Sequence, residues 1–165
     1  MSDIFSEHLV KRKPKSSEQA LKYGLIFLTA FLILGGLFIL GPLIYPGIIL
    51  GVVCYFFIFP RFNVEYEYSY VNGEFDIDVI YSMSKRKHKE TFSVTNVECV
   101  APLGSHQLDA FQHDFQVTDY SSLDPDVRPY VFVLPQERRI IYMQIEDDSL
   151  ITDLKYRLPR RFFTE

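Results

Sequence analysis

The most strongly charged stretch of the sequence is a run of five basic residues near its middle. Its members are Lys85, Arg86, Lys87, His88 and Lys89. Clustered Lys and Arg side chains attract acidic lipid headgroups, although on a solvated turn the same charges can serve only to prevent pairing at a sheet edge. A second basic group, Arg160 and Arg161, is followed by two Phe residues, a composition suited to a membrane interface. These two groups form the candidate membrane-surface site.

A second set of residues could bind a metal ion. It consists of His106, Asp109, His113 and Asp114. His and carboxylate side chains are common zinc and transition-metal ligands, but the spacing matches no strong zinc motif, and a polar surface helix is the favoured interpretation. The sequence also lacks a nucleophile elbow, a Gly-rich phosphate loop and a dinucleotide-binding fingerprint. We therefore predict no enzyme, no bound metal and no cofactor.

The longest uncharged run of the chain, residues 23–60, precedes both groups. It is nearly twice the length of about 20 residues that one transmembrane helix needs. Pro42 and Pro46, each beside a Gly, interrupt it near the middle, and proline stops a helix because it lacks a backbone donor. The run predicts a transmembrane hairpin with helices near residues 22–40 and 46–60. A shallow re-entrant hairpin is the alternative.

Basic residues flank this hairpin at both of its ends. They are Lys11, Arg12, Lys13, Lys15 and Lys22 before it and Arg61 after it. Because the turn between the helices carries no charge, the positive-inside rule places both termini in the cytoplasm and the protein in the cell membrane. Residues 1–21 hold few apolar side chains and are predicted to form a flexible basic tail. Cys54 lies in the hairpin and Cys99 in the soluble part, so no disulfide is expected.

Small residues recur on one face of the second predicted helix. Gly47 and Gly51 are four positions apart, a spacing that lets helices approach closely in lipid. Packing on the first helix of the same chain is the favoured interpretation. The seam of a homodimer is the alternative, since such motifs serve either purpose.

Residues 61–165 are long enough for one independent domain. They hold 12 Lys and Arg against 18 Asp and Glu, a net charge of −6, which argues against a general nucleic-acid binder. Hydrophobic alternation with a period of two indicates strands, and Asn72-Gly73 is a strong hairpin turn signal. Strands are predicted over residues 64–70, 75–83, 92–100, 117–120, 130–134 and 139–145, with a bulge near Asn96, a turn over 84–89 and helices near 106–113 and 147–158.

The order of these elements resembles a known family. The stretch from Tyr66 through Asn72-Gly73 to the basic run, continuing into Phe92-Ser-Val-Thr-Asn-Val, is similar to bacterial pleckstrin-homology-like (PH-like) domains that follow membrane hairpins. It is also similar to small uncharacterised two-pass membrane proteins of Gram-positive bacteria. The resemblance implies a mainly-β domain over residues 61–165, a bent antiparallel sheet or partly open barrel with one C-terminal amphipathic helix.

The leading hypothesis is a non-enzymatic docking or assembly module at the inner membrane face. Its docking surface would be a sheet edge, the 102–126 insertion or the basic turn, and its partners would be membrane lipids and a protein that the sequence does not identify. Two strands of about nine residues, each roughly 30 Å long, would bring the basic turn back to the bilayer. Anionic-lipid binding through Lys85, Arg86, Lys87 and Lys89 is the alternative, and a metal-dependent enzyme is the third hypothesis.

Overall fold

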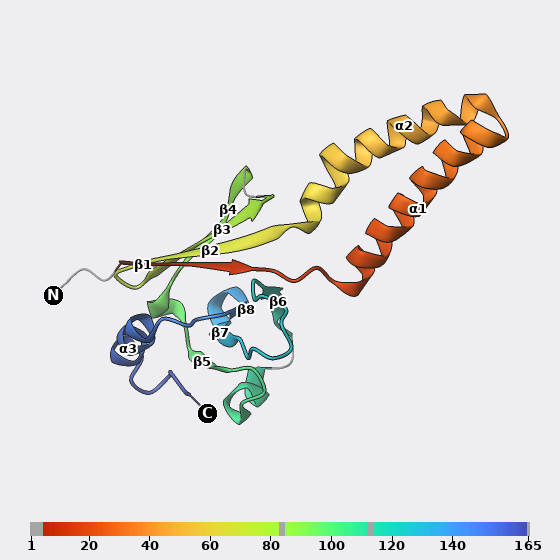
Figure 1. Ribbon diagram of the computed structural model, residues 1–165. Coiled ribbons are helices and arrows are strands. Elements are labelled where there is room, and N and C mark those ends of the chain that lie inside the picture. The colour runs from red at the N-terminus through yellow and green to blue at the C-terminus, as the bar shows by residue number, and fades with distance from the viewer. Residues whose placement is uncertain (1–4, 83–84, 112–113, 165) are drawn as a thin grey trace.

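A long helical hairpin projects from one end of a two-sheet domain in the computed structural model, which describes residues 5–82, 85–111 and 114–164 (Figure 1). The chain opens with a strand, forms the hairpin, and then builds both sheets and a C-terminal helix. This order agrees with the predicted two apolar helices followed by a mainly-β domain with one helix at its end. The sheets do not close into a barrel.

The first helix of the hairpin, α1, spans Ser16–Phe38. The second runs without interruption through a 3₁₀ turn, α2 (Ile44–Val53), a π turn and a further 3₁₀ turn that ends at Phe62. Pro46 lies in the first turn of α2, where its missing N–H has no helical partner to lose. Both helices are long and apolar enough to cross a membrane.

The prediction of a flexible tail over residues 1–21 was wrong for most of that segment. Phe5–Lys11 forms strand β1, which pairs antiparallel with β2 (Val64–Val71). Only Val10 is a buried apolar residue in β1, so the segment looked too polar to fold on its own. The edge of β2 supplies its hydrogen bonds, and α1 starts at Ser16 because the Glu18 carboxylate accepts a bond from the Lys15 backbone N–H (3.0 Å).

The first sheet has the order β1-β2-β3-β4, with antiparallel neighbours throughout. The Asn72-Gly73 turn joins β2 to β3 (Glu74–Tyr81), and both of its residues have positive φ, 50° and 100°. The chain turns again directly after β3, with Ser82 at a φ of 50°. The prediction of a turn over 84–89 was therefore wrong for the described part, because β4 already begins at Lys85 and runs to Ser93. Residues 83 and 84 lie outside the described residues.

The second sheet has the order β5-β7-β8-β6. The predicted strand over 92–100 is divided between the sheets, since a 3₁₀ turn at Val94–Asn96 replaces the expected bulge and separates β4 from β5. The strands are β5 (Cys99–Pro102), β6 (Gln116–Asp119), β7 (Tyr130–Leu134) and β8 (Arg139–Met143), with β6 parallel to β8. The predicted C-terminal helix is α3 (Asp148–Arg157).

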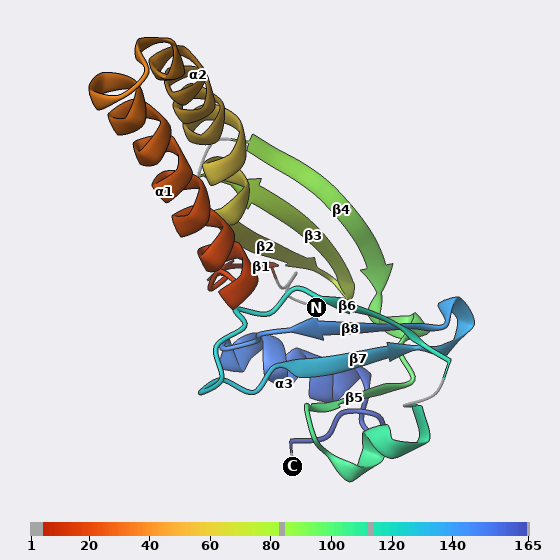
Figure 2. The same ribbon diagram turned by 90° about the vertical axis from the view of Figure 1, so that its right-hand side faces the viewer.

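The core lies between the two sheets and is closed by α3 (Figure 2). Phe75 of β3 contacts Tyr70 of β2, Phe92 of β4 and Phe132 of β7, with ring centroids 4.7–5.6 Å apart. Leu154 of α3 is fully buried in the same cluster. Aromatic pairs at these distances add to the hydrophobic stabilisation of the core. The domain is thus one packed unit to which the hairpin is attached.

Candidate functional site

The basic run of residues 85–89 lies in an edge strand and not in a turn. Lys85 pairs with Tyr81, and the neighbouring Ser82 donates its backbone N–H to Asn63 O (2.9 Å) and its hydroxyl to Pro60 O (3.0 Å). The start of β4 therefore lies beside the end of the second hairpin helix, as the strand lengths predicted. The expectation that the run returns toward the hairpin agrees with this geometry.

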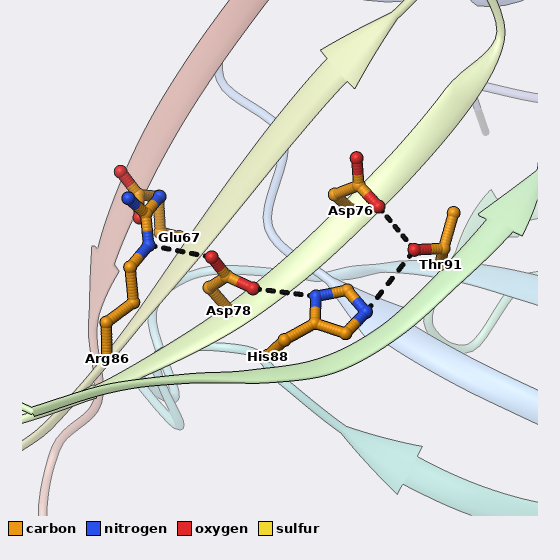
Figure 3. Close-up of polar contacts among 6 residues, drawn as sticks. All are labelled: Glu67, Asp76, Asp78, Arg86, His88 and Thr91. Carbon is orange, nitrogen blue, oxygen red and sulfur yellow. Dashed lines mark hydrogen bonds and ion pairs between the residues drawn. The ribbon is translucent and has the colours of Figure 1, made fainter.

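The side chains of this run divide between the two faces of the sheet. Arg86 donates from Nε to Asp78 Oδ2 (2.7 Å) and forms an ion pair from Nη2 with Glu67 (Figure 3). Alternation along the strand turns Lys85 and Lys87 to the opposite face, where both are exposed. The guanidinium of Arg86 is thus neutralised by neighbouring strands, whereas the lysines keep their charges available to a partner.

His88 joins three polar residues into a chain on the outer face of the sheet. Its Nδ1 lies 2.9 Å from Asp78 Oδ1, its Nε2 lies 3.4 Å from Thr91 Oγ1, and Thr91 donates its hydroxyl to Asp76 (Figure 3). A hydroxyl, an imidazole and a carboxylate in this order can form a nucleophilic triad. Here the Thr91 hydroxyl donates to Asp76 and not to His88, and the His88 side chain is 57% exposed. The chain therefore links β3 to β4 and has the features of a cross-strand polar network.

Two residues of this network were not singled out by the sequence, Glu67 and Thr91. Glu67 alternates with buried tyrosines in β2, and Thr91 follows the basic run in β4. The sequence carries no usable sign of their role, because the basic run 85–89 was predicted to be a turn and not a strand that faces acidic residues. Only the register of β4 on β3 decides which polar side chains lie opposite each other.

Arg160 and Arg161 lie far from the start of β4. They contribute to a pocket with Thr95 and Asn96, which follow the distal end of β4, and Arg161 Nη1 donates to Val97 O (3.2 Å). The C-terminus and the hairpin lie at opposite ends of the molecule in both views (Figures 1 and 2). The structure thus does not bring the two basic groups of the predicted membrane-surface site together, because the C-terminal segment pairs with β5 through Val100 and Phe162.

Gly47 and Gly51 face the first helix of the hairpin. A Cβ atom on Gly47 would lie 2.9 Å from Ile33 Cγ1, and one on Gly51 would lie 3.3 Å from Thr29 Cγ2. Gly36 of α1 is placed equally closely, since its Cβ would lie 2.5 Å from the backbone N of Ile44. These glycines therefore pack against the other helix of the same chain, in agreement with the favoured interpretation of the Gly47 and Gly51 spacing.

The proposed metal ligands lie on or beside a short 3₁₀ helix, His106–Phe111. His106 Nδ1 is 3.5 Å from Asp109 Oδ2, and the two side chains are 100% and 62% exposed. Asp114 is exposed, and His113 lies outside the described residues. Within the described part of the chain, no three His, Cys, Asp or Glu side chains are grouped closely enough to hold a metal ion.

A comparison with known protein families bears on this arrangement of sheets and helix. Residues 2–164 match the family described as "Bacterial PH-like domain (DUF6106)". The chain belongs to this family. The predicted resemblance to bacterial PH-like domains is confirmed, whereas the relation to two-pass proteins of Gram-positive bacteria stays a prediction. No curated protein and no solved structure matches the chain. A PH-like domain is usually a non-catalytic binding fold, and the polar network on its outer sheet face fits that pattern.

Proposed function

We propose that this PH-like protein is a non-enzymatic docking module, anchored in the cell membrane by its two apolar helices and presenting its domain at the cytoplasmic face. The hairpin side chains support the anchoring. Phe27, Phe31 and Phe38 are 63–78% exposed, and continuous apolar surface of this extent is covered by a membrane or a partner. The helices have 23 and 22 residues, and their uncharged parts, residues 23–38 and 41–60, are about 24 and 30 Å long, close to a hydrocarbon core of about 30 Å.

The observation that carries the proposal is the way the hairpin joins the domain. β1 leads into α1 and the second helix leads into β2, and these two strands are paired along their whole length. Arg12 N also donates to Val64 O (3.0 Å) directly below the helices. A domain held by two paired strands has a defined orientation to its anchor, which suits a surface that must meet a partner at the membrane.

The orientation follows from the charges beside the hairpin. Lys22 and Arg61 border the apolar helices on the domain side, whereas the connecting turn at Gly41–Leu43 carries no charge. By the positive-inside rule the domain and both termini are cytoplasmic. A C-terminal reporter that is active only outside the cytoplasm should stay silent, and activity of that reporter would refute this orientation.

The docking surface is the free edge of β4. This strand is nine residues long, and among the residues that the structure describes it pairs on one side only, with β3. Its backbone groups on the other side can accept an added strand from a partner. Because Lys85, Lys87 and Lys89 are exposed along it, the complementary partner segment is extended and acidic.

Site-specific crosslinking of the full chain in its membrane tests this function. A photoreactive residue in place of Lys87 should crosslink to a partner protein, whereas the same residue in place of Leu9, on the opposite edge strand β1, should not. Equal crosslinking at both positions would refute a specific surface at β4. Affinity capture should recover the same partner with the full chain but not with a chain ending at Arg61, which would show that the domain, and not the hairpin, provides the contact.

The alternative function is anionic-lipid binding by the same strand. The exposed Lys85 at the hairpin end of β4 favours it, and Arg86 contributes little because it is paired with Glu67 and Asp78. Replacing Lys85, Lys87 and Lys89 with Ser would then abolish retention of anionic lipid without unfolding the domain. Retention of lipid together with loss of the affinity-captured partner would favour protein docking.

A further inference from the structure

A pocket of about 300 Å³ lies at the base of the hairpin, between the start of α1 and the end of the second helix. This volume is at the lower end of the range of ligand pockets, roughly 300–1,000 Å³. Its lining combines two chemical kinds of side chain. Lys11, Arg12 and Lys22 are cationic, and Tyr23, Phe59 and Phe62 are aromatic.

One carboxylate lines the pocket beside the three cations. Glu18 accepts two bonds of 2.9 Å from Arg12 Nη2 and one of 3.0 Å from the Lys15 backbone N–H. With one carboxylate against three cations, the lining holds a net charge of +2.

The cations of the pocket are incompletely paired. Lys11 and Lys22 form no ion pair with any residue that the structure describes, and Lys22 Nζ instead lies 5.8 Å from the centre of the Phe59 ring. The Arg12 side chain is only 11% exposed, and its buried Nε has no hydrogen-bond partner within the described residues. A buried donor without an acceptor is unfavourable, and rotation of the guanidinium toward a bound anion would relieve it.

The two kinds of lining residue match the depth profile of a membrane surface. The apolar run begins at Tyr23 and ends at Pro60, so Tyr23 and Phe59 lie where acyl chains meet headgroups and where aromatic rings are favoured. Lys11 and Arg12 lie on the domain side of these rings, at the end of β1. The anionic head of a lipid would meet the cationic side chains, and its apolar tail would meet the aromatic rings.

We propose that this pocket binds the phosphate-bearing headgroup of an anionic phospholipid, with the phosphate against Lys11, Arg12 and Lys22 and the upper acyl chain along Tyr23 and Phe59. The proposal rests on the membrane anchoring proposed above. It is distinct from lipid attraction by β4, because its residues come from β1 and from both ends of the hairpin. The bound lipid would hold the domain against the bilayer at the point where the helices emerge.

Native mass spectrometry of the full chain tests the pocket. The detergent-solubilised protein is mixed with equimolar phosphatidylglycerol and phosphatidylcholine, and we expect one phosphatidylglycerol molecule to be retained in preference. The double variant Lys11→Gln, Lys22→Gln should retain it about tenfold less. The matched control Lys85→Gln, Lys87→Gln removes the same charge from β4 and should retain it as the unmodified protein does. Circular dichroism shows whether each variant is folded. Phe59→Leu keeps all charges but removes the ring under Lys22, and its loss of lipid retention should be intermediate.

The possible outcomes distinguish failure of the proposed lipid site from failure of the proposed membrane anchoring. Equal retention by the Lys11/Lys22 and Lys85/Lys87 variants, or equal retention of both lipids, would overturn the headgroup site while leaving the anchoring intact. Binding of inorganic phosphate in preference to the lipid, when both are offered at equal concentration, would make this a site for a free anion and would overturn the proposal. Recovery of the unmodified protein in the soluble fraction of cells would refute the anchoring itself.

Discussion

Large aromatic residues occupy opposite environments in the two halves of this molecule. In the hairpin, Phe27 and Phe38 are 73% and 78% exposed, and the buried positions of the two α-helices are Gly36 and Gly47. In the domain, Phe75 and Phe132 are fully buried between the sheets. A domain that folds in water is stabilised when a phenyl ring is buried away from solvent. Helices that pack in lipid are stabilised by close contact of their backbones, which small residues permit. The two halves thus apply opposite packing rules, as expected if they fold in different solvents.

Removal of one aromatic ring from each half tests this contrast and should give the largest difference in stability. Phe75→Ala should lower the free energy of unfolding of the domain by about 3–5 kcal/mol, because the ring fills the core between the sheets. Phe27→Ala, at an exposed position that would face lipid in the proposed anchor, should change it by less than about 0.5 kcal/mol. Urea titration of the full chain in detergent, followed by near-ultraviolet circular dichroism, measures both. Equal losses would place Phe27 in a packed core and remove the contrast.

Alanine substitutions of the glycines sharpen the same comparison within the hairpin. Gly36→Ala and Gly47→Ala should each destabilise the helix pair by about 1–3 kcal/mol, since a new Cβ would lie 2.5 Å and 2.9 Å from the neighbouring helix. Gly51→Ala, at 3.3 Å, should cost less, and Gly24→Ala, with open space around it, should cost nothing. Unfolding in increasing concentrations of a denaturing detergent measures the stability of the helix pair in each variant and so gives the order of the four effects. A dimer that dissociates while helix-pair stability is unchanged would instead make this face a seam between two copies.

The N-terminus of α3 offers a pH-dependent test of the domain. The Ser6 hydroxyl donates to Asp147 Oδ2 (2.7 Å), and Ser149 donates to its other oxygen, so that the pKa of Asp147 falls from 3.8 to about 2. A lowered pKa means that the ionised carboxylate stabilises the fold above about pH 4, and that this stabilisation is lost as the pH falls toward 2. Asp147→Ala should cost about 1 kcal/mol at pH 7 as a lost helix cap.

Asp147→Asn is the control for this effect. Asn is an equally good cap, so this variant should be nearly as stable as the unmodified chain at pH 7. It cannot titrate, and its stability should therefore fall less between pH 4 and pH 2. Identical pH profiles for the two proteins would show that the bond between β1 and α3 contributes nothing.

The smallest effect concerns adjacent residues of β4. Arg86→Gln should lower the free energy of unfolding by about 0.5 kcal/mol, since the arginine is paired with Glu67 and Asp78 on an exposed face. Lys87→Gln should not change stability but should weaken affinity capture of an acidic partner. The reverse pattern would mean that Arg86 is the recognition residue and that Lys87 supports the strand.

The hairpin and the C-terminal helix were determined by the sequence alone. The uncharged run of residues 23–60 required two helices, and Asn72-Gly73 required a tight turn, since both signals depend on neighbouring residues only. The end helix α3 likewise follows from its cap at Asp147 and its apolar face. These elements need no knowledge of what lies elsewhere in the chain.

The tertiary structure decided the partners of segments that are marginal by themselves. β1 is a strand because β2 offers a free edge, and the basic run of 85–89 is a strand because β3 places Asp78 opposite His88 and within reach of the Arg86 side chain. The pocket at the hairpin base unites Lys11, Lys22 and Phe59, which are far apart in sequence. Arg160 and Arg161 were assigned to the membrane surface by composition, but pairing of the C-terminal segment with β5 carries them to the opposite end. Composition shows which charges a chain holds, and only the register and the sheet order bring them together.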